Sequence, residues 1–79
     1  MQVVPIKEGG MGAEGFVSYP DGLQPAQVKT LLKQVELAIH DYNEIPPRTR
    51  NNLSLDKAEF ITYYLHKAGF RDAKYEYFG

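Results

Sequence analysis

The chain has 79 residues, of which 43% are hydrophobic and 24% charged, a composition typical of a globular protein and not of a disordered one. This length predicts a single domain, 1–79, near the lower limit for chains that fold without disulfides or metals. Cysteine is absent, which excludes disulfides and thiolate metal sites. The sequence contains neither a secretory signal pattern nor an apolar run of membrane-spanning length, so we expect a cytoplasmic protein without a membrane partner.

Charge is unevenly distributed along the chain. The formal net charge is −1, which argues against a dedicated nucleic-acid-binding protein. Residues 1–47 contain three Lys and six acidic residues, whereas residues 48–79 contain six Lys or Arg and four acidic residues. The basic C-terminal part still permits a local patch that attracts an anionic partner.

The N-terminal residues predict two short strands. The first is indicated by Val3, Val4 and Ile6. Pro5 lacks the N–H that a central strand would need, so we place this strand at a sheet edge or in a bend. Residues 9–15 predict a glycine-rich turn, and residues 16–19 predict the returning strand.

A long amphipathic helix is predicted from Pro25 to about Asn43. Proline is well suited to the first turn of a helix, and Pro46 and Pro47 are expected to end it. Residues 48–52 then predict a polar loop. The helix residues that share one apolar stripe and are expected to face the core are Val28, Leu31, Leu32, Val35, Ala38, Ile39 and Tyr42.

A second helix and a final strand are predicted from Ser54 onward. Ser54 is a candidate N-cap, and Asp56 falls in the first turn, where the helix dipole favours a carboxylate. Gly69 is placed where a left-handed C-terminal cap is expected, with Phe70 folding back onto the helix. Apolar residues at helical spacing are Leu55, Ala58, Ile61, Leu65 and Ala68, and Ala73, Tyr75 and Tyr77 then alternate with polar residues as in a half-buried strand.

The predicted elements follow the order ββααβ, which is typical of the α+β class. We expect a two- or three-stranded sheet with both helices packed on one of its faces. A sheet this small has an unpaired edge strand, and that edge permits a homodimer formed by sheet extension.

Residues 10–17, Gly-Met-Gly-Ala-Glu-Gly-Phe-Val, match the pattern G-x-G-x-x-G of dinucleotide-binding loops and the longer kinase-loop pattern. The surroundings do not fit either protein class. A dinucleotide motif opens a helix, but strand-like residues and Pro20 follow here, and the other kinase motifs are missing from the sequence. Glu14 also places a negative charge where a phosphate would bind. We therefore interpret this segment as a hairpin tip and expect no cofactor.

The sequence offers no convincing metal or catalytic site. His40 and His66 are predicted on polar faces of different helices, and no pair of residues has the two-His spacing of a zinc motif. We interpret both as surface residues near helix C-termini, where a protonated His complements the dipole. A nucleophile elbow, a Cys nucleophile and a Ser–His arrangement are all missing from the sequence. We predict no metal site, no catalytic residues and no enzymatic activity.

The segment around Arg48 and Arg50 is a candidate anion-binding site. Two Arg side chains beside a helix start are suited to bidentate contacts with phosphates or carboxylates. The residues predicted to extend this basic patch are Lys57, Arg71 and Lys74. Tyr63 or Phe78 would provide a ring on which a nucleic-acid base can stack. An RNA- or DNA-binding module is therefore the alternative function.

Three large apolar side chains are surplus to the predicted core: Leu37, Tyr63 and Phe78. Exposed apolar residues that are surrounded by charged ones are typical anchors for a protein partner. We therefore predict a small non-enzymatic interaction module that binds a protein partner as an inhibitor or adaptor. Such short, slightly acidic chains are common among accessory proteins of phages and mobile elements.

Overall fold

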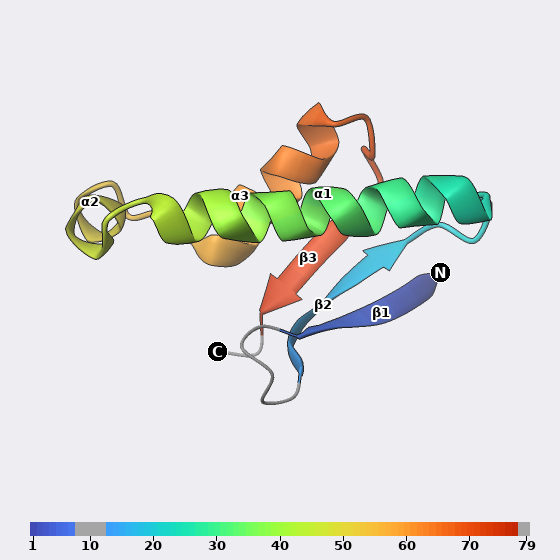
Figure 1. The fold of residues 1–79 in the computed structure, drawn as a ribbon, viewed down its shortest axis with the longest axis horizontal. Coiled ribbons are helices and arrows are strands. Elements are labelled where there is room, and N and C mark those ends of the chain that lie inside the picture. The colour runs from blue at the N-terminus through green and yellow to red at the C-terminus, as the bar shows by residue number, and fades with distance from the viewer. Residues whose placement is uncertain (8–12, 78–79) are drawn as a thin grey trace.

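The computed structural model describes residues 1–7 and 13–77, and within them three antiparallel strands and three helices form an α+β fold (Figure 1). The elements in chain order are β1 (Gln2–Lys7), β2 (Ala13–Tyr19), α1 (Pro25–Glu44), α2 (Pro47–Asn52), α3 (Lys57–Lys67) and β3 (Lys74–Tyr77). The predicted fold class is confirmed. The strand order is β1-β2-β3, and the helix α2 replaces the loop expected at residues 48–52.

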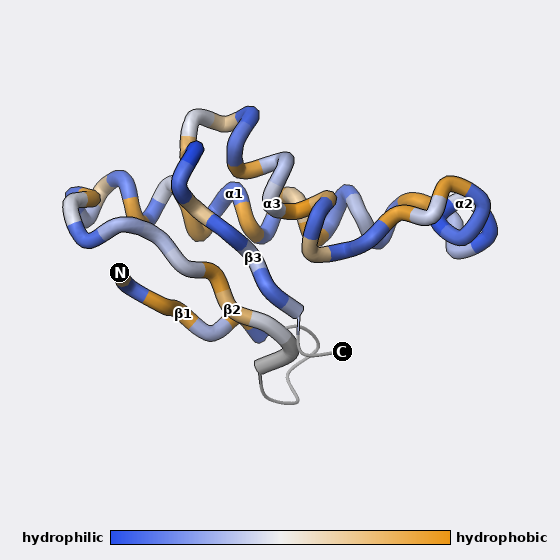
Figure 2. Tube along the Cα trace, turned by 180° about the vertical axis from the view of Figure 1, so that it is seen from behind, coloured by the Kyte–Doolittle hydropathy of each residue, from blue (hydrophilic) through white to orange (hydrophobic). Residues whose placement is uncertain are grey.

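The sheet buries one face against the helices. Val4 pairs with Val17 and Val17 with Tyr75, so these three side chains form a row on the same side of the sheet. Val17 and Tyr75 are fully buried. Figure 2, seen from behind, shows β3 passing in front of α1, and none of the described helices covers the other side of the sheet. Val3 and Lys74 are exposed on that side.

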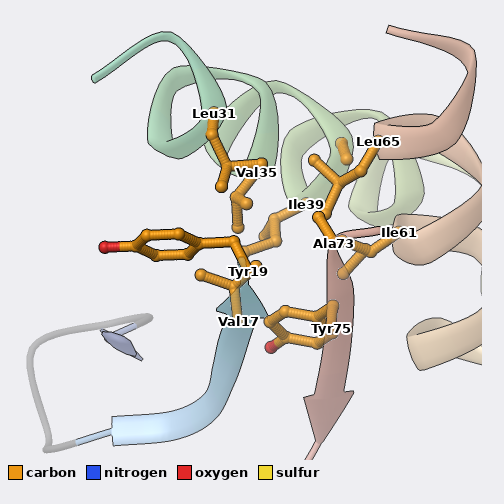
Figure 3. Packing of buried hydrophobic residues seen from close by; sticks show 10 residues of the cluster. Val17, Tyr19, Leu31, Val35, Ile39, Ile61, Leu65, Ala73 and Tyr75 are labelled. Carbon is orange, nitrogen blue, oxygen red and sulfur yellow. The ribbon is translucent and has the colours of Figure 1, made fainter. Parts of the chain in front are cut away.

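The long helix α1 follows the predicted pattern. It begins at Pro25, preceded by Gln24, whose backbone N–H donates to the Oε1 of Gln27 at 2.8 Å. Its C-cap is Ile45, because Pro46 and Pro47 prevent continuation. The predicted stripe is confirmed in its centre, and Figure 3 shows Leu31, Val35 and Ile39 pointing toward the sheet. The buried residues of α1 are Leu31, Val35, Ala38, Ile39 and Tyr42.

The ends of α3 differ in how well they match the prediction. The N-cap is Asp56, whose side chain accepts a hydrogen bond from the Glu59 N–H at 3.0 Å. The prediction of Ser54 as cap is wrong, since Ser54 has a φ of 52° in the turn that precedes this helix. At the C-terminus Gly69 has a φ of 103°, and the Phe70 N–H donates to the Leu65 carbonyl at 3.0 Å. This is the predicted left-handed cap.

The two edges of the sheet differ in their hydrogen-bond partners. The outer edge of β3 is bonded by side chains of α3: Thr62 bonds the backbone of Tyr75, and His66 Nε2 donates to the Ala73 carbonyl at 2.9 Å. The other edge strand is β1, which confirms the edge position predicted from Pro5. The β1 edge is therefore the one that a further strand could join without displacing α3.

Two strand predictions need correction. β2 begins at Ala13, three residues before the predicted start at Phe16, so the last part of the glycine-rich segment is strand and not turn. Tyr77 lies in the alternation with Tyr75 but is 43% exposed. Its ring is contacted by Lys57, whose Nζ lies 4.7 Å from the ring centroid, and the amphiphilic lysine only partly covers it. Residues 8–12 and Phe78 lie outside the described part of the chain.

The helix α2 extends beyond the C-terminal end of α1, away from the sheet (Figure 1). It starts with Pro47 at its first position, where the missing N–H is tolerated. The guanidinium of Arg50 stacks on Tyr42, with its Cζ 4.9 Å from the ring centroid. This contact ties α2 to the end of α1.

Candidate interaction surface

Tyr63 is the most exposed large aromatic side chain of α3. It is 64% exposed and lines two shallow grooves, one on each side of the helix. The first, here called the Tyr63 groove, has a volume of about 410 Å³ and is lined by Gln34, Phe60, Tyr63, Tyr64, Lys67 and Ala68. The second, here called the β3 groove, has a volume of about 310 Å³ and lies between α3 and β3.

The Tyr63 groove is built from both long helices. Gln34 comes from α1, while the aromatic rings of Phe60 and Tyr64 come from α3 and lie 6.4 Å apart. These rings recur one turn apart because residues at i and i+4 share a helix face. The Nζ of Lys67 lies 5.6 Å from the centroid of the Tyr63 ring, within the range of a cation–π contact. The groove therefore has an aromatic lining and a cation at its margin.

Asp41 of α1 interacts with the Tyr64 hydroxyl of α3 beside the Tyr63 groove. Hydrogen bonding to Asp41 raises the pKa of the Tyr64 hydroxyl above its ordinary value, with smaller contributions from desolvation and from the negative charge of Asp41.

Of the two predicted interface residues that the structure describes, Tyr63 lines the Tyr63 groove and Leu37 does not. Leu37 is 41% exposed on α1, three residues after Gln34 and four before Asp41. Residues at these spacings are neighbours on a helix surface, and both neighbours of Leu37 face α3. Leu37 therefore lies alongside the Tyr63 groove. The third predicted residue, Phe78, is outside the described part of the chain.

The β3 groove has more ionisable side chains in its lining than the Tyr63 groove. It is lined by Ala58, Glu59, Thr62, Tyr63, His66, Lys74 and Tyr75. Thr62 and His66 already bond the edge of β3. The Nζ of Lys74 lies 3.5 Å from a carboxylate oxygen of Glu76, an exposed ion pair that is expected to contribute little stability.

The five predicted anion-contact residues do not form one patch. Arg50 and Lys57 both lie over the ring of Tyr42, at 4.9 and 6.0 Å, and Arg48 is exposed on α2 nearby. Arg71, in contrast, lines a pocket with Leu23 and Gln27 at the start of α1, and Lys74 is on β3. Because α1 separates its two ends by about 30 Å, Arg71 is far from α2.

Among the described residues, neither histidine belongs to a group of metal-ligating side chains. His40 is exposed, with its Nε2 3.4 Å from Oε1 of Glu44 and its Nδ1 3.7 Å from Oδ1 of Asp41. His66, in contrast, donates a hydrogen bond to the Ala73 carbonyl. Within residues 1–7 and 13–77, no three His, Asp or Glu side chains come together as metal ligands. In that same part of the chain, no helix combines the length and apolar character needed to cross a membrane.

Two features of this surface were not predicted from the sequence. The grooves depend on how α1 meets α3, and the bonds from Thr62 and His66 to β3 depend on the position of the final strand. The spacing of Thr62 and His66, four residues apart, was a usable signal for a polar stripe on α3. Comparison with models of protein families, with curated proteins and with solved structures finds no match for this chain.

Proposed function

We propose that this chain is a non-enzymatic module that binds a protein partner through the surface formed by α1 and α3, and that it acts as an inhibitor or adaptor. The observation that supports this proposal is the exposure of Tyr63 between two grooves, 64% of its surface being open to solvent. Leu37 adds a second exposed apolar side chain beside the same groove.

The physical argument rests on the cost of leaving such groups in water. A rigid aromatic side chain loses little conformational entropy on binding and covers a large apolar area, which makes tyrosine a frequent anchor at interfaces. On this surface its neighbours are partly buried rings and the stem of Lys67. A partner that covers Tyr63 would therefore gain apolar burial without having to open the fold.

A homodimer is a narrower form of this proposal. Sheet extension at β3 would have to displace the bonds from Thr62 and His66, so the edge of β1 is the favoured place for it. Pro5 and Lys7 lie on that strand, and both residue types are common on edge strands that avoid pairing. We therefore place a separate protein partner before a second copy of the chain.

Nucleic-acid binding is the alternative proposal. Its supporting observation is the position of Arg48, exposed on a helix that projects from the body of the protein, with Arg50 and Lys57 near it. Arg71 is far from these residues, and Lys74 is paired with Glu76, so Arg48, Arg50 and Lys57 remain as the main basic side chains. A protein partner is therefore our primary proposal.

The test is affinity capture from a lysate of cells that naturally make the chain, with and without nuclease. We expect Tyr63→Ala and Leu37→Ala to weaken retention of a discrete partner, Tyr63→Ala by about tenfold or more. Leu53→Ala and Tyr77→Ala are matched controls, because these residues are also exposed, by 64% and 43%, but lie elsewhere. Equal retention of the partner by all four variants would refute the proposal. Loss of the captured proteins after nuclease treatment would favour nucleic-acid binding.

A further inference from the structure

Building on the proposed function, we propose that the Tyr63 groove binds an acidic segment of the partner protein. An apolar side chain of that segment enters the groove, and a neighbouring carboxylate pairs with Lys67. The partner chemistry is thus an apolar residue next to Asp or Glu, presented on an exposed peptide segment or helix.

The lining of the groove fits an apolar side chain. Phe60, Tyr63 and Tyr64 contribute three rings to the lining. Ala68 also lines the groove, at the C-terminal end of α3, and its small side chain leaves space there. A volume of about 410 Å³ falls within the size range of ligand-binding clefts, about 300–1,000 Å³. The rings are partly exposed and already positioned, so little reorganisation is needed to receive a guest.

The positive charge of Lys67, at the edge of the Tyr63 groove, favours an acidic residue next to the partner's apolar side chain. Among the described residues that line the groove, Lys67 carries the charge, and its ammonium lies over the face of Tyr63. An ammonium has three N–H donors, so N–H groups that do not point at the ring remain available to a carboxylate. The Asp41 carboxylate interacts with Tyr64 and is not among the residues that line the groove.

The β3 groove on the other side of Tyr63 is different. Among the described residues that line it, Lys74 and Glu59 balance in formal charge, and Lys74 is also paired with Glu76. Residues 48–79 as a whole carry six Lys or Arg and four acidic residues. The charge preference of this surface therefore rests on Lys67, where a basic partner segment would meet a like charge and an acidic one an opposite charge.

Other occupants fit these features less well. A nucleic acid requires several cations along one path, whereas Lys67 stands beside an aromatic groove and Arg48 and Arg50 lie on α2. A second copy related by two-fold symmetry would bring the same basic margin to both sides of the contact. An acidic, apolar protein segment satisfies both the lining and the charge.

The test uses matched synthetic peptides that share a central Leu-Phe pair flanked by Glu, by Gln or by Lys. A fourth peptide keeps the Glu flanks and replaces the central pair by Ala. Binding is measured by fluorescence anisotropy, and the site is mapped by amide chemical shifts in NMR. We expect the Glu-flanked Leu-Phe peptide to bind most tightly, to weaken as salt is added, and to shift the amides of Gln34, Tyr63 and Lys67.

Variants separate charge from fold. Lys67→Glu should reverse the preference toward the Lys-flanked peptide, and Lys67→Ala should weaken the Glu-flanked peptide by about threefold to fivefold, as for an exposed pair. Lys29→Glu is the control, since it makes the same change of charge on an exposed residue of α1 outside this groove. It should leave the order of the peptides unchanged.

Several results would overturn the inference. These are equal binding of the Gln- and Glu-flanked peptides, absence of binding at millimolar peptide, and shifts confined to residues outside the groove. The same shifts caused by a single-stranded oligonucleotide or by raising the protein concentration alone would assign the surface to nucleic acid or to a second copy. If Tyr63→Ala loses the natural partner but Lys67→Glu retains it, the proposed function stands and the acidic-segment inference is wrong.

Discussion

The hydroxyl of Thr62 bonds both backbone groups of Tyr75: it accepts from the N–H at 3.0 Å and donates to the carbonyl at 3.3 Å. One side chain of α3 thus takes the place that a neighbouring strand would occupy along β3. Thr62 is partly buried and Tyr75 is fully buried, so little water is available to replace these bonds.

Thr62→Val tests this relationship with a side chain of similar shape. We expect the free energy of unfolding to fall by about 1–3 kcal/mol, because a buried N–H and carbonyl lose their partner. Urea unfolding measures the change, and hydrogen exchange of the Tyr75 amide should become faster. Thr30→Val is the control, since the Thr30 hydroxyl donates only to the Ala26 carbonyl on the exposed side of α1. Equal stability of the two variants would contradict the assigned role.

Local patterns explain which parts of the fold could be predicted. The spacing of Leu31, Val35 and Ala38 fixes the inner side of α1, and Gly69 marks the end of α3 by its own conformational freedom. α2 was missed because its six residues are too few to show a period, and Pro47 indicates a helix stop as readily as a helix start.

The N-cap of α3 and the candidate site show two other limits. Ser54 and Asp56 are both capping residue types, but only Asp56 has a Glu three residues later, the spacing of a capping box. That signal was available in the sequence. The sequence did not show that Arg48, Arg71 and Lys74 lie in separate regions. Their positions depend on the end of α1 to which each later segment returns.

Gly15 has a packing role that its place in a glycine-rich motif does not reveal. A Cβ added at Gly15 would meet the Tyr75 ring and hydroxyl, and would lie 2.5 Å from the Glu76 carbonyl oxygen. Tyr75 is a fully buried core residue, so the phenol cannot swing aside into solvent. The absence of a side chain at Gly15 therefore allows the Tyr75 ring to pack across β2.

We expect Gly15→Ala to destabilise the protein by about 1–3 kcal/mol through overpacking. Gly22→Ala is the matched control, because a Cβ at Gly22 has no heavy atom within 4 Å. Thermal unfolding of both variants measures the difference. A melting temperature of Gly15→Ala equal to that of Gly22→Ala would show that the close approach to Tyr75 is relieved at no cost.

The effect of Asp41 on the pKa of Tyr64 predicts a specific dependence of stability on pH. Because the folded-state pKa of Tyr64 is raised above its ordinary value of 10.0, this group stabilises the fold fully below that pH. The contribution is lost as the pH rises through the folded-state pKa. Phenolate absorbance should therefore show one tyrosine that titrates later than an unperturbed one.

Two variants identify that tyrosine. Tyr64→Phe should remove the late component from the titration curve, and Asp41→Asn should move it back toward pH 10, since the negatively charged acceptor is lost. A late component that persists in Tyr64→Phe would assign it to another tyrosine. An unchanged component in Asp41→Asn would show that desolvation, not Asp41, raises the pKa.

At the opposite end of the pH range, Asp21 holds the start of β1. Its two carboxylate oxygens bind the Met1 ammonium and the Gln2 side-chain amide, each at 3.0 Å. The bond from the ammonium contributes most to lowering the pKa of Asp21 below 3.8, followed by the Gln2 bond and the positive charge. A lowered pKa means that the contribution to stability is present above the unfolded-state value and is lost as the pH falls through the folded-state value.

We therefore expect Asp21→Asn to lower the melting temperature at neutral pH and to reduce the difference from the natural chain as the pH falls below about 4. A chemically synthesised chain with an acetylated Met1 removes the ammonium and should reproduce most of this effect. Combining both changes should cost less than their sum, because they remove the same ion pair. Strictly additive losses would show that Met1 and Asp21 stabilise the protein independently.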